Sequence, residues 1–197
     1  VARAFGERGP RVLAAILAGA ALALAGGVVQ GTVRNPLAEP GLLGITAGAG
    51  LGAVCIVTLA GGGRAWMIAA AVAGGLLTFA VIAALSWRGG LRPERFVLIG
   101  IGCGYAITSV TTFLLLRSDP WKTPRIMTWL SGTTYGRTLP DVVPVAVVLI
   151  VAVPLLLAMR RQLDLLATDD DTPRILGVRP GPARLGVLAV AAILAAV

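Results

Sequence analysis

The sequence predicts an all-α protein that crosses a lipid bilayer several times. The 197 residues are 57% hydrophobic and only 13% charged, and their mean hydropathy is +0.89. Soluble domains carry about 25% charged residues. Long apolar runs alternate here with short connectors that hold Arg, Asp and Pro, which is the layout of a multi-pass membrane protein. A bundle of buried helices in a soluble core is the alternative, but these runs have almost no polar face to offer water.

The apolar runs have the length that a membrane requires. A helix needs about 20 apolar residues to cross about 30 Å of hydrocarbon. Five runs meet this length approximately, and a sixth starts near Arg184: 12–33, 41–60, 65–87, 96–116, 142–159 and 184–197. We therefore expect one transmembrane domain over 1–197, with five full spans, part of a sixth, and a polar connector at 160–183. The chain starts without Met and stops inside an apolar run, so we interpret it as a fragment of a longer polypeptide.

Glycines recur at every fourth position in three of the runs. They are Gly27 and Gly31; Gly44, Gly48 and Gly52; and Gly100 and Gly104. Stripes of small residues let membrane helices approach closely. A nucleotide-binding loop is the alternative, but neither 48–52 nor 100–104 has the G-x-G-x-x-G spacing, and no P-loop sequence occurs. We therefore predict that these glycines are helix-packing positions.

Polar and helix-breaking residues gather in one window, Gln30 to Pro40. Pro36 and Pro40 disfavour helix at the residue before each of them. The first run should therefore end near Arg34, and Pro40 should lie in the first turn of the next helix. We predict a tight reversal whose polar groups satisfy the backbone groups at the two helix ends. Gln30 would face either a partner helix or a water-filled path, and both interpretations stay open.

The connector 160–183 contains a short predicted helix at 170–177. Asp170, Asp171 and Thr172 precede Pro173, which predicts side-chain caps followed by a proline at the first helical position. Gly177 supplies the stop. A helix of little more than one turn is not stable alone in water, so it needs a surface on which to dock. That surface is either a partner protein or the chain itself.

The charged residues exclude some functions but give little information about the orientation of the chain in the membrane. The net charge is +8, but the basic residues are spread over short connectors without a basic face or arm, so we expect no nucleic-acid partner. The chain has no His, and Cys55 and Cys103 each lie in an apolar run, so we expect no metal site and no disulfide framework. The connectors that include 34–40, 88–95 and 160–184 carry nine basic residues and the opposite set carries eight. This difference only slightly favours the first set as cytoplasmic.

The stretch 8–54 resembles the signature of the iron-siderophore, haem and vitamin B12 permease family of ABC importers. Members of that family have an apolar helix, a Gln, then R-N-P-L-A-x-P-x-x-L-G and a helix rich in small residues. The matching positions here are Gln30, Arg34, Asn35, Pro36, Leu37, Ala38, Pro40, Leu43 and Gly44. The resemblance continues through W-L-S-G at 129–132 to 160–178, so it covers nearly the whole chain.

The resemblance implies a fold of about ten membrane helices per subunit, of which the first run here would be the second. It places 34–40, 88–95 and 160–183 in the cytoplasm, and it implies that the short helix couples the permease to an ATPase. The implied coupling residues are Asp170, Asp171, Thr172, Arg174, Leu176 and Gly177. The family motif there reads L-G-[DE]-x-A-x-x-L-G-V, but this chain has Asp169 and Pro173 where Gly and Ala are usual. We expect these departures to alter the helix start or the affinity for the partner.

The resemblance further implies the permease subunit of an ATP-driven importer that carries a ferric siderophore across the bacterial cytoplasmic (inner) membrane. Haem and cobalamin are alternative cargoes. The implied partners are an ATPase dimer that binds ATP and Mg, a second permease subunit, an extracytoplasmic binding protein and membrane lipid. We expect no catalytic residue and no bound cofactor in this chain. An ion-coupled transporter or a membrane enzyme is less favoured, because the predicted spans contain no carboxylate and no His or Lys.

Overall fold

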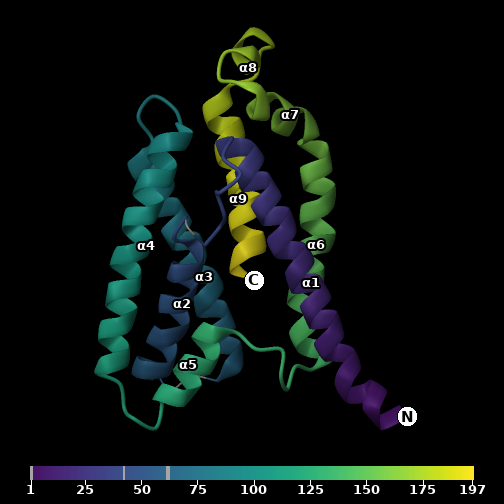
Figure 1. Cartoon of the computed structure of the whole chain (residues 1–197), viewed down its shortest axis with the longest axis vertical. Helices are drawn as coiled ribbons and strands as arrows, with labels where there is room; N and C mark the ends of the chain where they lie inside the picture. The colour runs from purple at the N-terminus through teal and green to yellow at the C-terminus, as the bar shows by residue number, and fades with distance from the viewer. Residues whose placement is uncertain (1, 42, 61–62) are drawn as a thin grey trace.

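The computed structural model describes residues 2–41, 43–60 and 63–197, and the side chains among them from residue 8 onward. This part of the chain forms a helical bundle with no β-strand, so the predicted all-α class is confirmed (Figure 1). The elements are α1 (Ala2–Val33), α2 (Ile45–Cys55), a π-helical extension η1 (Ile56–Ala60), α3 (Arg64–Ser86), α4 (Pro93–Leu116), α5 (Thr123–Ser131), α6 (Leu139–Ala158), α7 (Arg160–Thr168), α8 (Thr172–Ile175) and α9 (Pro180–Ala196).

Four of the described helices are long and apolar enough to cross a membrane. They are Arg8–Val33, Arg64–Ser86, Pro93–Leu116 and Leu139–Ala158. The helical stretches Ile45–Ala60 and Pro180–Ala196 are apolar but shorter. The multi-pass character of the chain follows from these four spans alone.

The helix that follows the polar window begins later than the sequence suggested. We expected Pro40 in its first turn, but α2 starts at Ile45, with Gly44 as N-cap at φ +74°. That prediction was wrong because the Gly44 N–H donates to the carbonyl of Gly41 at 3.1 Å, which forms a separate turn before the helix. Figure 1 shows the chain leaving the upper end of α1 and reaching α2 about midway along the bundle.

Glycines bring α2 and α3 into backbone contact. A Cβ on Gly48 would clash with the side chain of Thr78 and would lie 2.7 Å from the carbonyl oxygen of Gly74. A Cβ on Gly52 would clash with the carbonyl of Ala70. The packing prediction is therefore confirmed for Gly48 and Gly52.

Gly27 and Gly31 on α1 behave differently. Within the described part of the chain, a Cβ at either position would meet no heavy atom within 4 Å. Both line an apolar groove of about 460 Å³ between α1, α6 and α7. The prediction of packing was therefore wrong for these two residues within this chain.

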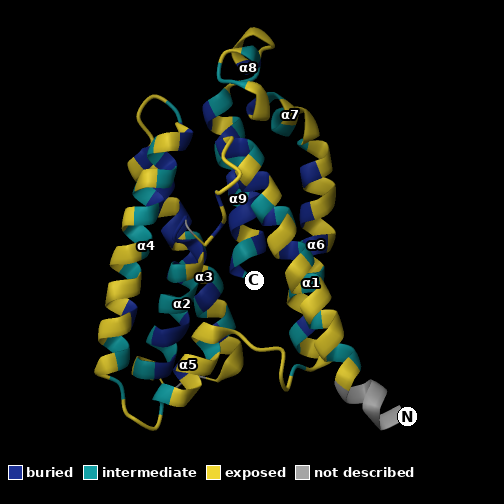
Figure 2. Ribbon diagram, in the orientation of Figure 1, coloured by how far each residue is buried: buried dark blue, intermediate teal, exposed yellow. Residues whose placement is uncertain are grey.

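The buried core lies between the inner faces of the helices, and the outer faces remain apolar. Val29 of α1, Ile82 of α3 and Ala191 of α9 are fully buried in one cluster. Large side chains such as Leu98 of α4 and Ile150 of α6 are exposed. Figure 2 shows exposed residues along the outer faces of α1, α4 and α6. Exposed apolar helix faces are expected where a protein contacts lipid or neighbouring helices.

Candidate functional site

The motif at 34–44 begins with a tight turn. Arg34 follows the last residue of α1 and has a left-handed backbone with φ +57°, which is uncommon for any residue except glycine. The side chain of Asn35 accepts a hydrogen bond from the Leu37 N–H at 2.9 Å, and its carbonyl accepts one from the Ala38 N–H at 3.0 Å. Asparagine favours turns through such local bonds. The predicted reversal after Arg34 is confirmed.

The second half of the motif enters the bundle and packs on α4. Ala38, Pro40 and Leu43 are buried, whereas Pro36 is exposed. A Cβ on Gly44 would lie 3.0 Å from the carbonyl oxygen of Gly100 and 3.2 Å from the Cα of Gly104. The two backbones therefore touch without side chains between them, which confirms the packing prediction for these glycines.

Gln30 lies on the exposed face of α1, one turn before its end. The described residues offer its side chain no hydrogen-bond partner. Both interpretations of Gln30, a contact with a partner helix and a position on a water-filled path, therefore stay open.

The short helix in the 160–183 connector is capped by a residue that we did not predict. The carboxylate of Asp169 accepts hydrogen bonds from the N–H groups of Asp171 at 2.9 Å and Thr172 at 2.6 Å, and from the Thr172 hydroxyl at 2.8 Å. The bond from the Thr172 N–H is the main cause that lowers the pKa of Asp169. We expected Asp170, Asp171 and Thr172 to act as caps, and this was wrong because the side chain of Asp170 bonds to arginines instead. Pro173 is the second residue of the helix, one position later than predicted, and lies in its first turn.

The end of the helix has the predicted geometry. Gly177 has φ +78°, and its N–H donates to the carbonyl of Arg174 at 3.1 Å. Positive φ at this position is the usual way to end a helix. Arg174 pairs with Asp171 at 3.2 Å, so the expected i,i+3 pair exists, but both side chains are exposed.

The tip of this helix presents apolar side chains to the outside. Ile175 is 83% exposed and Leu176 is 50% exposed, while Pro173 is buried against the chain. The helix therefore rests on its own chain through one side and leaves an apolar tip free. We call residues 169–177 the α8 segment.

Asp170 joins the α8 segment to two distant helices. Its Oδ1 atom pairs with Arg34 at 2.7 Å and with Arg184, in the second turn of α9, at 3.0 Å. Arg184 is only 1% exposed, and it also donates to the carbonyl of Leu91 in the α3–α4 connector at 2.9 Å. We call Arg34, Asp170, Arg184 and the Leu91 carbonyl the charge node.

The charge node has clear electrostatic consequences. Burial alone would raise the pKa of Asp170, but the hydrogen bonds and charges of Arg184 and Arg34 hold it below its ordinary value. Arg184 was not among the site residues predicted from the sequence. The available signal was an arginine at the edge of an apolar run, where a charge needs a partner.

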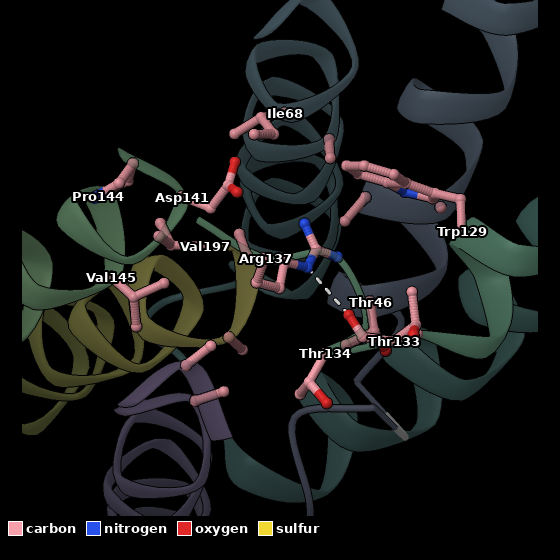
Figure 3. Close-up of a pocket in the computed structure, with 18 of the residues that line it drawn as sticks. Thr46, Ile68, Trp129, Thr133, Thr134, Arg137, Asp141, Pro144, Val145 and Val197 are labelled. Carbon is pink, nitrogen blue, oxygen red and sulfur yellow. Dashed lines mark hydrogen bonds between the residues drawn. The ribbon is translucent and has the colours of Figure 1, made fainter. Parts of the chain in front are cut away.

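A cavity of about 440 Å³ lies between α1, α2, α3, α5, α6 and α9 (Figure 3). Its labelled lining residues are Thr46, Ile68, Trp129, Thr133, Thr134, Arg137, Asp141, Pro144, Val145 and Val197. Its two charged residues are engaged with the protein: Arg137 donates to the carbonyl of Thr133 at 2.9 Å, and Asp141 pairs with Arg64 at 3.1 Å. Asp141 also accepts from Thr138 in a capping box, whose T-x-x-D spacing is visible in the sequence. These contacts order the 132–138 connector and join the start of α6 to the start of α3.

Comparison with known families identifies the chain. The model of the FecCD transport family matches residues 4–197. The chain belongs to the FecCD transport family. The resemblance seen in the 34–44 motif and in the α8 segment is thereby confirmed.

Individual members of the FecCD family align over most of this chain. The iron(3+)-hydroxamate import system permease protein FhuB of Salmonella typhimurium is 36% identical over 190 residues, which are 96% of this chain and 28% of FhuB. The ferric enterobactin transport system permease protein FepG of Escherichia coli is 34% identical, covering 95% of this chain and 57% of FepG. The cobalamin import system permease protein BtuC of Halobacterium salinarum is 33% identical, covering 95% and 51%. The chain thus spans from about a quarter to three fifths of the length of these relatives.

A solved structure has the same fold. It is described as an inward-facing conformation of a metal-chelate type ABC transporter, and it matches with a TM-score of 0.89 at 29% sequence identity. The match covers 96% of this chain and 60% of that one. The predicted multi-helix architecture of the FecCD type is therefore confirmed.

Proposed function

We propose that this chain forms part of the permease subunit of an ATP-driven importer that carries a ferric siderophore across the cytoplasmic membrane of a bacterium. The observation that carries the proposal is the α8 segment, which is fixed to the end of α1 and to α9 yet leaves Ile175 and Leu176 exposed. An apolar tip on an anchored support suits a contact with a second protein. Family membership agrees with this assignment, since the related proteins are import system permeases.

The proposed partner at the α8 segment is an ATPase subunit, which would bind ATP and Mg and supply the energy. A second permease subunit would cover exposed faces such as that of Gln30, and a binding protein would deliver cargo at the opposite end. With that arrangement, the charge-node end of the bundle is cytoplasmic. An ion-coupled carrier is not favoured, because the described carboxylates of the four long spans, Glu94 and Asp141, lie in first helical turns and not at membrane depth.

A ferric siderophore is the proposed cargo because relatives named for iron-hydroxamate and ferric enterobactin transport are 34–36% identical. Cobalamin is the second candidate, favoured by the relative of 33% identity that is named for cobalamin import.

The test is uptake in a strain that lacks its own permease for the cargo. The full-length protein would be expressed together with an ATPase and a binding protein from the same organism. Uptake of radiolabelled ferric hydroxamate that depends on ATP supports the proposal. If only labelled cobalamin is taken up, cobalamin and not a siderophore is the cargo. Uptake that persists without the ATPase would refute the importer assignment.

A further inference from the structure

The charge node connects parts of the chain that are far apart in the sequence. Asp170 belongs to the α8 segment, Arg34 to the end of α1, and Arg184 to α9. Arg184 alone already attaches the segment to the bundle, because it is buried and also holds the carbonyl of Leu91. The bond from Arg34 to Asp170 is therefore a second attachment, and it needs a reason of its own.

The backbone of Arg34 indicates that its side chain is needed. A residue with φ +57° would be less strained as Asn or Gly. An arginine there gains nothing in the turn itself, since Asn35 makes the local bonds. Its guanidinium is the group that reaches Asp170, at 2.7 Å.

The turn that follows Arg34 ends in close packing against α4. Leu43 is buried, and the backbone of Gly44 lies directly against Gly100 and Gly104. A contact between two backbones has no flexible side chain to absorb a displacement. A displacement of Gly44 would therefore have to be accommodated by α4 at Gly100 and Gly104.

We propose that Asp170 and Arg34 are positioning residues that make the α8 segment and the 34–44 turn move as one unit, so that displacement of the segment by the ATPase shifts α4. The inference rests on the proposed function for the source of that displacement. The link itself belongs to the chain and is testable without the partner.

The test uses full-length permease in which Cys55 and Cys103 are replaced by Ala and spin labels are attached at Leu37→Cys and Ile175→Cys. Both label sites are well exposed, at 79% and 83%. Arg34→Asn removes the guanidinium and suits the left-handed backbone, so it should fold. Arg34→Lys keeps a cation, and Arg174→Ala removes an exposed pair outside the charge node as a matched control.

We expect one narrow distance distribution between the labels in the parent protein, in Arg34→Lys and in Arg174→Ala, and a broad one in Arg34→Asn, all without ATPase. In the complete transporter, Arg34→Asn should still bind the ATPase. The number of cargo molecules moved per ATP hydrolysed should fall at least about fivefold, which is the lower end of a typical coupling between sites. Arg34→Lys should restore most of that ratio.

A narrow distribution and an unchanged ratio in Arg34→Asn would overturn the inference. Failure of the parent protein to bind an ATPase or to move cargo would overturn the proposed function instead. The label distances would still decide whether the segment and the turn are locked together.

Discussion

Asp170→Asn tests how strongly the charge node stabilises the fold. The substitution leaves Arg184 buried at 1% exposure, with the Leu91 carbonyl as its remaining strong acceptor among the described residues. Removing one partner of a buried ion pair typically costs about 3–5 kcal/mol. The Asp170 side chain is 35% exposed, so water screens part of the pair. We therefore expect a loss of about 2–3 kcal/mol, of which the exposed Arg34 arm supplies at most about 1.

The measurement is the unfolding midpoint of the full-length permease in a denaturing-detergent titration. Asp171→Asn is the matched control, since this neighbouring aspartate loses only an exposed i,i+3 pair, worth about 0.2–0.5 kcal/mol. Adding Arg184→Met to Asp170→Asn should recover much of the loss, because the buried charge is then gone. If Asp170→Asn and Asp171→Asn unfold at the same point, the charge node does not stabilise the protein as argued.

Three further predictions follow from the same contacts. Gly48→Ala should lower stability by about 1–3 kcal/mol, because its Cβ would meet Thr78 and Gly74, whereas Gly27→Ala should be tolerated; equal unfolding midpoints would contradict this. Leu176→Asp should strip a co-purified ATPase from the full-length permease, whereas Arg174→Ala should retain it; full retention by Leu176→Asp would remove the α8 tip as the docking surface. Because the pKa of Asp170 is lowered in the folded protein, its contribution to stability is complete above the ordinary aspartate pKa of about 3.9 and is lost as the pH falls through the lowered value. The difference in unfolding midpoint between wild type and Asp170→Asn should therefore shrink in that acidic range. A difference that stays constant with pH would contradict this.

The long helices were predictable because membrane spans are encoded in local composition. Runs of about 20 apolar residues without charge have few other uses, and α3, α4 and α6 lie where such runs occur. The short helices α5 and α7 were not predicted. Each has only 9 residues and includes polar or charged positions, so neither produces a hydropathy signal.

The start of α2 depended on a contact that the sequence does not display. Pro40 is well suited to a first helical turn, but Gly44 must lie against Gly100 and Gly104, 56 or more positions away in the numbering. The left-handed backbone of Gly44 then sets where the helix can begin. Local rules identify the turn, and the tertiary contact decides its length.

The three consecutive aspartates show the same limit most clearly. Any of them is an acceptable cap by local rules, yet Asp169 caps α8, Asp170 holds two arginines, and Asp171 pairs with Arg174 at the surface. The division follows from Arg34 and Arg184, which lie 136 and 14 residues from Asp170 and both donate to its Oδ1 atom. Asp169 has φ −160°, an extended conformation open to any residue, so the glycine usual in the family is not required there. An aspartate at this position therefore supplies the cap, which leaves the carboxylate of Asp170 available for the charge node.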